Sequence, residues 1–383
     1  MGSSWKATSG RKPSKRGSRS HGGKRSAAAY TMHMQTLMSR ALRLSAALAV
    51  LASTTIAAVP ASAAPGDYTI SKTYALGGEG SWDYLIYDPG TKRLFISRST
   101  HVMVVDPASG AVVGDIPNTP GVHGIALAPE LGKGFTSNGR DGSVTVFDLA
   151  TLKTTAKIAT DGKNPDAIVY EPVSKRVYAF NGGSANATAV DARTNAVIGL
   201  VALGGRPEFA AAGENGLMYV NIEDKGQIVA IDARKNAVVS TWSIAPCEEP
   251  TGLAADAKHH RLFAGCSNKI MAVVDADSGK VVATPTIGDG VDATAFDVGT
   301  QLALSSNGEG TLTVVHEISP AAYEIKQNAT TVATARTLAL NPTNHDVYVV
   351  SATIKLGPPA AGQTRPTRTM VPGSFTLTVL SRS

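Results

Sequence analysis

The chain is built from short runs in which apolar and polar residues alternate, separated by clusters of turn residues. Between Asn164 and Gly199 there are four such runs, at 166–171, 175–181, 186–191 and 196–200. Alternation with a period of two, broken by turn residues about every 8–12 positions, predicts antiparallel β-strands rather than helices. This stretch therefore predicts four short strands joined by tight turns.

The first of these strands recurs along the chain. Its second residue falls at seven equivalent positions, 40 to 44 residues apart: Asp83, His123, Asp166, Glu208, Thr251, Asp292 and Arg336. A four-stranded unit that repeats at about 40–45 residues is typical of a propeller blade. We therefore predict an all-β fold, a seven-bladed β-propeller made of four-stranded antiparallel blades.

The two ends of the repeat region predict how the ring closes. A strand at 68–76 precedes the first repeat, and the last repeat has strands at 336–341, 346–351 and 375–380 but no fourth strand. If the N-terminal strand supplies the missing one, the ring closes and no open edge remains.

The repeats resemble those of the YVTN β-propeller family, which includes the YncE-like periplasmic proteins. In that family the second strand reads like Tyr-Val-Thr-Asn and the third ends in Asp. The matching second-strand ends are FTSN (135–138), YAFN (178–181), YVN (219–221) and LSSN (304–307), and the third strands end at Asp106, Asp148, Asp191, Asp232 and Asp275. The resemblance covers roughly residues 67–381 and implies the fold, while propellers carry many unrelated functions.

The N-terminal region differs from the repeats in composition. Residues 1–37 are polar, basic and without periodicity, and we interpret them as a disordered basic extension or as sequence upstream of the true start. A basic arm for nucleic acid is the alternative. Residues 38–63 read as a signal peptide, with Arg40 and Arg43 before an apolar run and Ala61-Ser62-Ala63 as a cleavage site. The propeller would then occupy residues 64–383.

The charge of the exported part differs from that of the whole chain. The formal net charge is +6, but residues 1–64 hold ten Lys and Arg and no acidic residue, which leaves 26 basic against 30 acidic residues, or −4. A mildly acidic body argues against nucleic-acid binding, which needs a basic surface. We expect a periplasmic or secreted monomer that does not span a membrane after removal of its signal peptide.

Two local features of the exported part are distinctive. Cys247 and Cys266 lie near the start of one first strand and at the end of the following strand, so a disulfide is plausible in an oxidising compartment; a metal pair or a reactive thiol is the alternative. Residues 352–373 form a long Pro- and Gly-rich insertion in the last repeat, which predicts a disordered loop or a lid on the face where the first strands begin.

The seven equivalent positions carry the candidate chemistry. In a propeller the innermost strands line the central channel, so these residues should converge on its mouth. Like charges that converge at a partly desolvated site need protons, water or a cation. We therefore expect a divalent metal ion, of unknown identity, on carboxylates and one imidazole. The predicted metal ligands are Asp83, His123, Asp166, Glu208, Glu249 and Asp292. Structural carboxylates that bind water and backbone amides are the alternative.

Further residues are predicted to contact a small-molecule ligand around this ring. Second strands end on the same face, and Asn at a strand end is also a common turn residue. The predicted ligand-binding residues are Trp82, Asn138, Arg140, Asn181, Asn221, Glu223, Thr251, Asn268, Lys269 and Asn307. Tyr84 and Phe209 would add an apolar wall with Trp82, although Trp82 buried between blades is an equal alternative.

These residues support three hypotheses of different kinds. The first is an enzyme similar to propeller lactonases or streptogramin lyases, with His123, Glu208, Asp166 and Arg336 as the predicted catalytic residues and a metal that polarises an oxygen. The second is a non-catalytic binding module. The third, nucleic-acid binding implied by the YncE-like resemblance, conflicts with the acidic mouth. Away from the mouth, His259-His260 is predicted to be an exposed turn, and His316 stands where other repeats have Asp.

Overall fold

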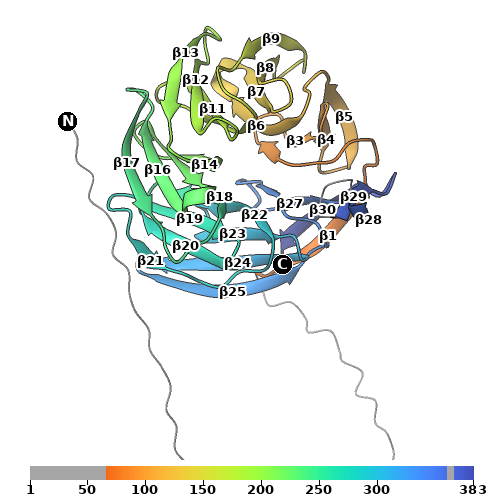
Figure 1. Cartoon of the computed structure of the whole chain (residues 1–383). Helices are drawn as coiled ribbons and strands as arrows, with labels where there is room; N and C mark the ends of the chain where they lie inside the picture. The colour runs from red at the N-terminus through yellow and green to blue at the C-terminus, as the bar shows by residue number, and fades with distance from the viewer. Residues whose placement is uncertain (1–65, 360–365) are drawn as a thin grey trace, which may run out of the picture. The chain divides into compact units, whose positions relative to one another are not determined.

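Seven four-stranded antiparallel sheets follow one another around a ring in this computed structural model, which describes residues 66–359 and 366–383 (Figure 1). This confirms the predicted seven-bladed β-propeller. The predicted basic extension at 1–37 and the predicted signal peptide at 38–63 lie outside the described residues. Among the residues that are described, no helix is both long and apolar enough to cross a membrane.

The blades take up the chain in order. Blades one to three contain β2 (Leu85–Asp88), β3 (Arg93–Ser97), β4 (Val102–Asp106), β5 (Ala111–Ile116), β6 (Val122–Ala128), β7 (Lys133–Asn138), β8 (Ser143–Asp148), β9 (Thr154–Ala159), β10 (Pro165–Glu171), β11 (Arg176–Asn181), β12 (Asn186–Asp191) and β13 (Val197–Ala202). Blades four and five contain β14 (Pro207–Ala212), β15 (Leu217–Ile222), β16 (Gln227–Asp232), β17 (Ala237–Ser243), β18 (Pro250–Asp256), β19 (Arg261–Cys266), β20 (Ile270–Asp275) and β21 (Val281–Ala283).

Blades six and seven complete the ring. They contain β22 (Val291–Asp297), β23 (Leu302–Asn307), β24 (Thr311–Ser319), β25 (Ala322–Thr330), β26 (Leu338–Leu340), β27 (Val347–Ser351), β30 (Thr376–Arg382) and β1 (Tyr68–Ala75). Two short 3-10 turns, Pro129–Leu131 and Glu223–Lys225, connect strands. The first strands of blades one and seven are shorter than the alternation predicts. As a result, Asp83 and Arg336 lie just before β2 and β26 and not within them.

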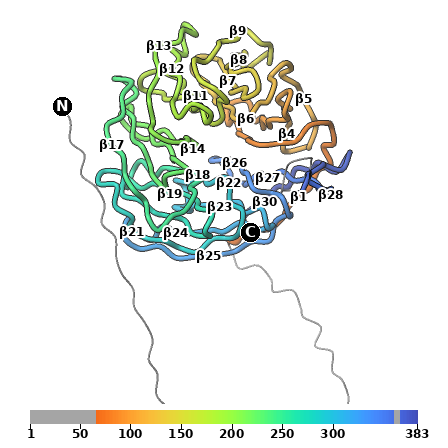
Figure 2. The backbone as a smooth tube through the Cα atoms, in the orientation of Figure 1, coloured from red at the N-terminus to blue at the C-terminus, as the bar shows by residue number. Residues whose placement is uncertain are grey.

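The first strand of each blade lies innermost. Each of β2, β6, β10, β14, β18, β22 and β26 contacts the first strand of the next blade around the ring, and β2 contacts β26 (Figure 2). The second and third strands are buried between neighbouring sheets, where aromatic and aliphatic side chains such as Phe95, Phe147 and Phe263 are fully enclosed. The starts of the first strands therefore meet at one end of the central channel.

The N-terminal strand closes the ring. The sheet order in blade seven is β1-β30-β27-β26, so β1 is the outermost strand of that blade and pairs antiparallel with the C-terminal strand β30. This confirms the predicted closure. Pairing the two ends of the propeller leaves blade seven without the unpaired edge that a missing strand would create.

The aspartates that end the third strands bind backbone amides of the turns that follow. Asp106 accepts a hydrogen bond from the Ala108 backbone N–H at 2.9 Å, and Asp191 accepts one from the Arg193 N–H at 2.9 Å. These carboxylates satisfy turn amides that would otherwise compete for water. They are therefore structural parts of the blades.

The insertion in blade seven is more regular than expected. It forms a two-stranded hairpin, β28 (Ile354–Pro359) and β29 (Pro366–Met370), between β27 and β30. The Cys247–Cys266 disulfide is also present, which confirms the predicted disulfide. Pro250 pairs with Cys266, so Cys247 lies just before the residue opposite its partner.

Candidate functional site

Five of the seven equivalent positions share a recurring irregularity of the β-sheet. In five of the first strands the pairing register shifts at the start of the strand, so that the singled-out residue lies in or beside a β-bulge, as between Pro165 and Ile168 in β10. A bulge adds a residue to one strand and re-aims its side chains. Here the bulges turn polar side chains into the channel while the rest of each strand stays buried.

Six of the seven predicted residues line one cavity of about 280 Å³ at the channel mouth. They come from six different blades and are joined in the lining by Tyr84 and Phe209: Asp83, His123, Asp166, Glu208, Asp292 and Arg336. Thr251 is the exception, because its hydroxyl donates to the Val291 carbonyl at 3.0 Å. Ring closure thus brings together residues up to 253 positions apart.

His123 lies between two carboxylates. Its Nδ1 atom is 2.7 Å from Asp83 Oδ2 and 3.6 Å from Asp166 Oδ1. Because an ionised carboxylate only accepts hydrogen bonds, the proton of this ring belongs on Nδ1. The hydrogen bond to Asp83 raises the pKa of His123, although burial opposes the charged form. The imidazole therefore holds a proton against two acids.

Arg336 forms the second bridge of the cluster. Its Nη2 atom lies 3.0 Å from Asp83 Oδ1, and its Nε donates to Asp292 Oδ2. Burial opposes ionisation of Asp83, but the hydrogen bond from His123 and the charge of Arg336 outweigh it and lower the pKa of Asp83. For Asp292 the balance is reversed, because burial raises its pKa more than Arg336 lowers it.

Two carboxyl groups of the cavity have strongly displaced pKa values. Burial, followed by the charges of Asp166 and Glu223, raises the pKa of Glu208 to about 9. Burial raises the pKa of Asp166 to about 6, although the charge of His123 opposes this shift. At neutral pH Glu208 is therefore a hydrogen-bond donor and Asp166 is mostly an acceptor. Separated pKa values of this kind divide acid and base roles in enzyme sites.

Three of the predicted metal ligands could hold one ion. Asp83, His123 and Asp166 each offer a ligand atom, and these atoms lie within 4.8 Å of one another. Glu208 and Asp292 line the same cavity, but Asp292 is occupied by Arg336. Glu249 is exposed and lies outside the lining residues of this cavity. The ligand set, two carboxylates and one imidazole, fits a divalent cation.

Most of the predicted asparagines are part of the blades. Asn138, Asn181, Asn221 and Asn307 are fully buried. The Asn138 amide donates to the hydroxyls of Ser143 and Thr145 at 2.9 and 2.8 Å, and the other three make similar contacts inside the sheets or to a neighbouring blade. The structure therefore does not bring their side chains into the cavity. Asparagine is common at strand ends, and these four residues have that structural role and do not contact a ligand in the cavity.

The other predicted ligand-binding residues lie around the mouth. Glu223 is close to Glu208 and forms an ion pair with Arg206 at 2.5 Å. Asn268 binds the Pro246 carbonyl at 2.8 Å, and Lys269 pairs with Asp289 at 3.2 Å. Arg140 is exposed. These side chains form a polar surround and not the cavity wall.

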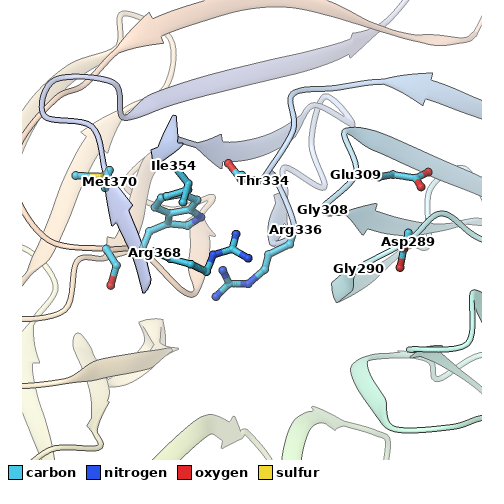
Figure 3. A pocket seen from close by; sticks show the side chains of 11 residues that line it. Asp289, Gly290, Gly308, Glu309, Thr334, Arg336, Ile354, Arg368 and Met370 are labelled. Carbon is cyan, nitrogen blue, oxygen red and sulfur yellow. The ribbon is translucent and has the colours of Figure 1, made fainter. Parts of the chain in front are cut away.

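A second cavity of about 460 Å³ adjoins the first at Arg336. It is bounded by Trp82 and by the hairpin β28–β29, which contributes Ile354, Arg368 and Met370. Trp82 is 6% exposed and packs on Phe375, with ring centroids 5.5 Å apart, so it is both buried and part of this wall. Figure 3 shows the Arg336 and Arg368 side chains pointing toward one another. Sequence reasoning placed the hairpin on this face but missed Arg368.

Comparisons with known proteins are consistent with the fold. No family model and no curated protein sequence matches the chain. Among solved structures, the chain is similar to U3-55K (9% identity, TM-score 0.67, 82% of this chain and 99% of the other) and to the RRP9 WD40 repeats (10%, 0.68, 83% and 99%). It is also similar to a hydrazine synthase chain from Kuenenia stuttgartiensis (15%, 0.64, 73% and 95%). At these identities the likeness shows the propeller fold alone.

Proposed function

We propose that the channel mouth binds a small anionic ligand together with a divalent cation. The observation that carries this proposal is the meeting of Asp83, His123 and Asp166, from three different blades, with ligand atoms within 4.8 Å of one another. A cation there would offset the repulsion between the carboxylates, and metal binding would displace the proton that His123 holds.

The arginines beside the cavity define the class of ligand. Arg336 and Arg368 both line the adjoining cavity, and guanidinium groups bind carboxylates and phosphates in a planar, two-pronged manner. Arg336 already pairs with Asp83 and Asp292, so Arg368 would hold the anionic group. Tyr84 and Phe209 supply an apolar wall next to the acids. We therefore expect a ligand with one anionic group, an apolar portion and an oxygen atom that reaches the cation.

The proton positions also suit catalysis. Glu208 is protonated at neutral pH and lies in the same cavity as Asp166, so the pair could donate and accept a proton on one bound molecule. A cation at the mouth would polarise a ligand oxygen. Ring-opening hydrolysis or elimination is the reaction class that this arrangement supports, and propeller lactonases and streptogramin lyases have a similar plan. A non-catalytic binding module would keep the cation and the ligand but show no turnover.

The test is a set of thermal melts with and without metal. Chelator-treated wild type, Asp166→Asn and Asp292→Asn are each melted with and without added MnCl2. Binding to the folded state raises Tm by mass action, so wild type and Asp292→Asn should gain stability with Mn²⁺ and Asp166→Asn should lose most of that gain. Asp292→Asn is the matched control. It also removes one acid of the cavity, but Asp292 pairs with Arg336 and is not one of the three proposed ligands.

Two outcomes would decide against the proposal or narrow it. Equal Mn²⁺ shifts in all three proteins, or no shift in any, would contradict a cation site at the mouth. A panel of lactones incubated with the Mn²⁺-loaded protein then separates enzyme from binding module. Acid release by wild type that is lost in Glu208→Gln supports turnover, whereas metal binding without acid release supports the binding module.

A further inference from the structure

A second cluster of acids and histidine lies at the far end of blade five. Asp256 is the last residue of β18, the strand whose start lies near the channel mouth, so the cluster is at the opposite end of that strand. His259 follows in the next turn, and Glu317 approaches from β24 of blade six. Asp256 and Glu317 are only 1% and 3% exposed.

Blades one and six show how an aspartate at this position is usually satisfied. The aspartate that ends the first strand binds a turn amide with one oxygen and a hydroxyl three residues later with the other. In blade one Asp88 binds the Gly90 N–H and the Thr91 hydroxyl at 3.1 and 2.6 Å, and Asp297 in blade six binds the Gly299 N–H and the Thr300 hydroxyl at 3.0 and 2.7 Å. Both oxygens are thereby satisfied.

Blade five departs from this pattern. Asp256 Oδ1 accepts the Lys258 backbone N–H at 3.0 Å, but His259 stands where the hydroxyl residue would be. His259 Nδ1 lies 2.7 Å from Asp256 Oδ2. Even so, these two buried atoms do not meet in hydrogen-bond geometry, and neither makes a hydrogen bond to another of the described residues. The second oxygen of a buried carboxylate is therefore left without its usual donor.

Blade six departs from the pattern at the point that faces this oxygen. In other blades a small or apolar residue follows the aspartate that ends the third strand, as at Ala192 and Ala233. The backbone N–H of this residue binds a carbonyl group in the turn between the first and second strands. Glu317 occupies that position in blade six, with its N–H bound to the Gln301 carbonyl. Its Oε1 lies 3.5 Å from His259 Nδ1, and its Oε2 is buried with no hydrogen-bond partner among the described residues.

We propose that Asp256, His259 and Glu317 form a second divalent cation site, of the Zn²⁺ class, between blades five and six. We call it the rim site. His259 in blade five and Glu317 in blade six both depart from the repeat pattern, and both lie next to the Asp256 carboxylate. Each of them adds an atom that can bind a metal ion. Ligand atoms about 2.0–2.2 Å from a tetrahedral Zn²⁺ lie roughly 3.3–3.6 Å apart. The 3.5 Å between His259 Nδ1 and Glu317 Oε1 falls in this range, whereas the 2.7 Å between His259 Nδ1 and Asp256 Oδ2 would widen on binding. His259 is partly exposed, so the site opens to solvent.

The energetics of the cluster favour a bound cation. Two buried carboxylates with no Lys or Arg ion pair recorded among the described residues repel one another, and burial followed by the charge of Asp256 raises the pKa of Glu317. A proton shared between the two acids would relieve the same repulsion, so it is the competing explanation. Three protein ligands, with the Asp256 orientation fixed by a backbone N–H, leave a further position for water.

The experiment is titration of the chelator-treated full chain with ZnCl2 by calorimetry and by thermal melting. Two variants restore the pattern of the other blades, and both are expected to fold for that reason: His259→Thr and Glu317→Ala. The expected result is saturable binding in wild type that weakens on the order of 100-fold in each variant. In chelator both variants should be as stable as wild type or more stable.

The controls separate this site from its neighbours and from the channel mouth. His260→Asn changes the adjacent histidine, which pairs with Asp277 at the surface, and should leave Zn²⁺ binding intact. Asp166→Asn should remove only binding at the mouth, so either site can fail independently of the other. In the Asp166→Asn background, which lacks binding at the mouth, Zn²⁺ binding that survives the addition of His259→Thr or Glu317→Ala would overturn the proposal. So would destabilisation of both variants in chelator without any Zn²⁺ effect on wild type, since that result supports the shared proton.

Discussion

Tyr84 and Phe209 pack against one another in a tilted arrangement across the central channel, with ring centroids 5.0 Å apart and an interplanar angle of 34°, although they belong to blades one and four. Both rings line the acidic cavity. The pair therefore narrows the channel beside the charged groups and couples two blades that are separated by two others in the chain. The two rings also keep water away from the charged groups beside them. Burial likewise raises the pKa of Tyr84 itself.

We predict that this aromatic pair contributes coupling energy of its own. Phe209→Leu and Tyr84→Leu should each destabilise the protein, and the double variant should cost less than the sum by about 0.5–1.5 kcal/mol, the typical value of an aromatic pair beyond its buried area. Denaturant unfolding of the four proteins measures this difference. Strict additivity would show that the rings are neighbours without mutual stabilisation.

The raised pKa of Glu208 predicts a defined pH dependence. The ordinary pKa of a glutamate is 4.5 and the folded value is about 9, so between these values the folded state binds more protons than the unfolded state. The stability of the chelator-treated protein should therefore fall as pH rises through this window. Glu208→Gln, which removes the ionisable group, should be more stable than wild type at pH 8–9 and should lose that part of the slope.

Melts of both proteins between pH 5 and pH 9 check this prediction. Asp148→Asn is a suitable control, because Asp148 has a lowered pKa from turn hydrogen bonds and lies in a third-strand turn. Parallel stability curves for wild type and Glu208→Gln would mean that Glu208 ionises normally in the folded protein.

The sequence predicted the blades because each one is specified locally. Spacing, alternation and turn residues recur in every repeat, so a departure in one repeat is visible against the others. The convergence of Asp83, His123, Asp166, Glu208 and Asp292 followed from their equivalent places in the repeat. The direction of the side chains depends on bulges that alternation does not reveal.

Contacts between distant repeats could not be predicted in the same way. The pairing of Arg336 with Asp83 and Asp292 depends on ring geometry, as does the approach of Glu317 to Asp256. The asparagines at the second-strand ends show that contacts within one blade can be missed as well. Their hydroxyl partners, such as Thr145 and Thr188, lie on the adjacent strand seven residues further on. This spacing recurs, but alternation alone does not show that the side chains bond to each other.

The Cys247–Cys266 disulfide fixes the chain that leads into β18. It closes a loop with a sequence separation of 19 residues, and Glu249 within that loop has a positive φ of 44°, which is uncommon for a residue with a side chain. We predict that the Cys247→Ser/Cys266→Ser double variant loses about 2–4 kcal/mol of stability. Denaturant melts with and without reductant measure this loss, and reductant should affect wild type alone. An unchanged midpoint in the double variant would contradict a structural role.

The closing strand β1 is held by a side chain of the neighbouring blade. Gln327 in β25, the outermost strand of blade six, accepts the Tyr68 backbone N–H with Oε1 at 2.8 Å and donates to the Tyr68 carbonyl with Nε2 at 2.9 Å. The Tyr68 hydroxyl donates to the His345 carbonyl at 3.0 Å, and its ring is 1% exposed. One amide side chain thus satisfies both backbone groups of the first residue of β1.

We predict that Gln327→Ala weakens ring closure more than it weakens the blades. Loss of the amide leaves a backbone N–H and a carbonyl of Tyr68 without their partner, at a cost of about 1–3 kcal/mol. The effect should be local, because β1 is the outermost strand of blade seven and pairs within that sheet with β30 alone. Hydrogen exchange followed by mass spectrometry should therefore show faster exchange in Tyr68–Ala75 and β30, with the first strands of blades two to five unchanged.

Lys326→Ala, on the same strand and exposed, is the control and should leave exchange in β1 at the wild-type rate. Faster exchange spread evenly over all seven blades would show that the ring opens as one cooperative unit and that Gln327 does not act on the closure alone.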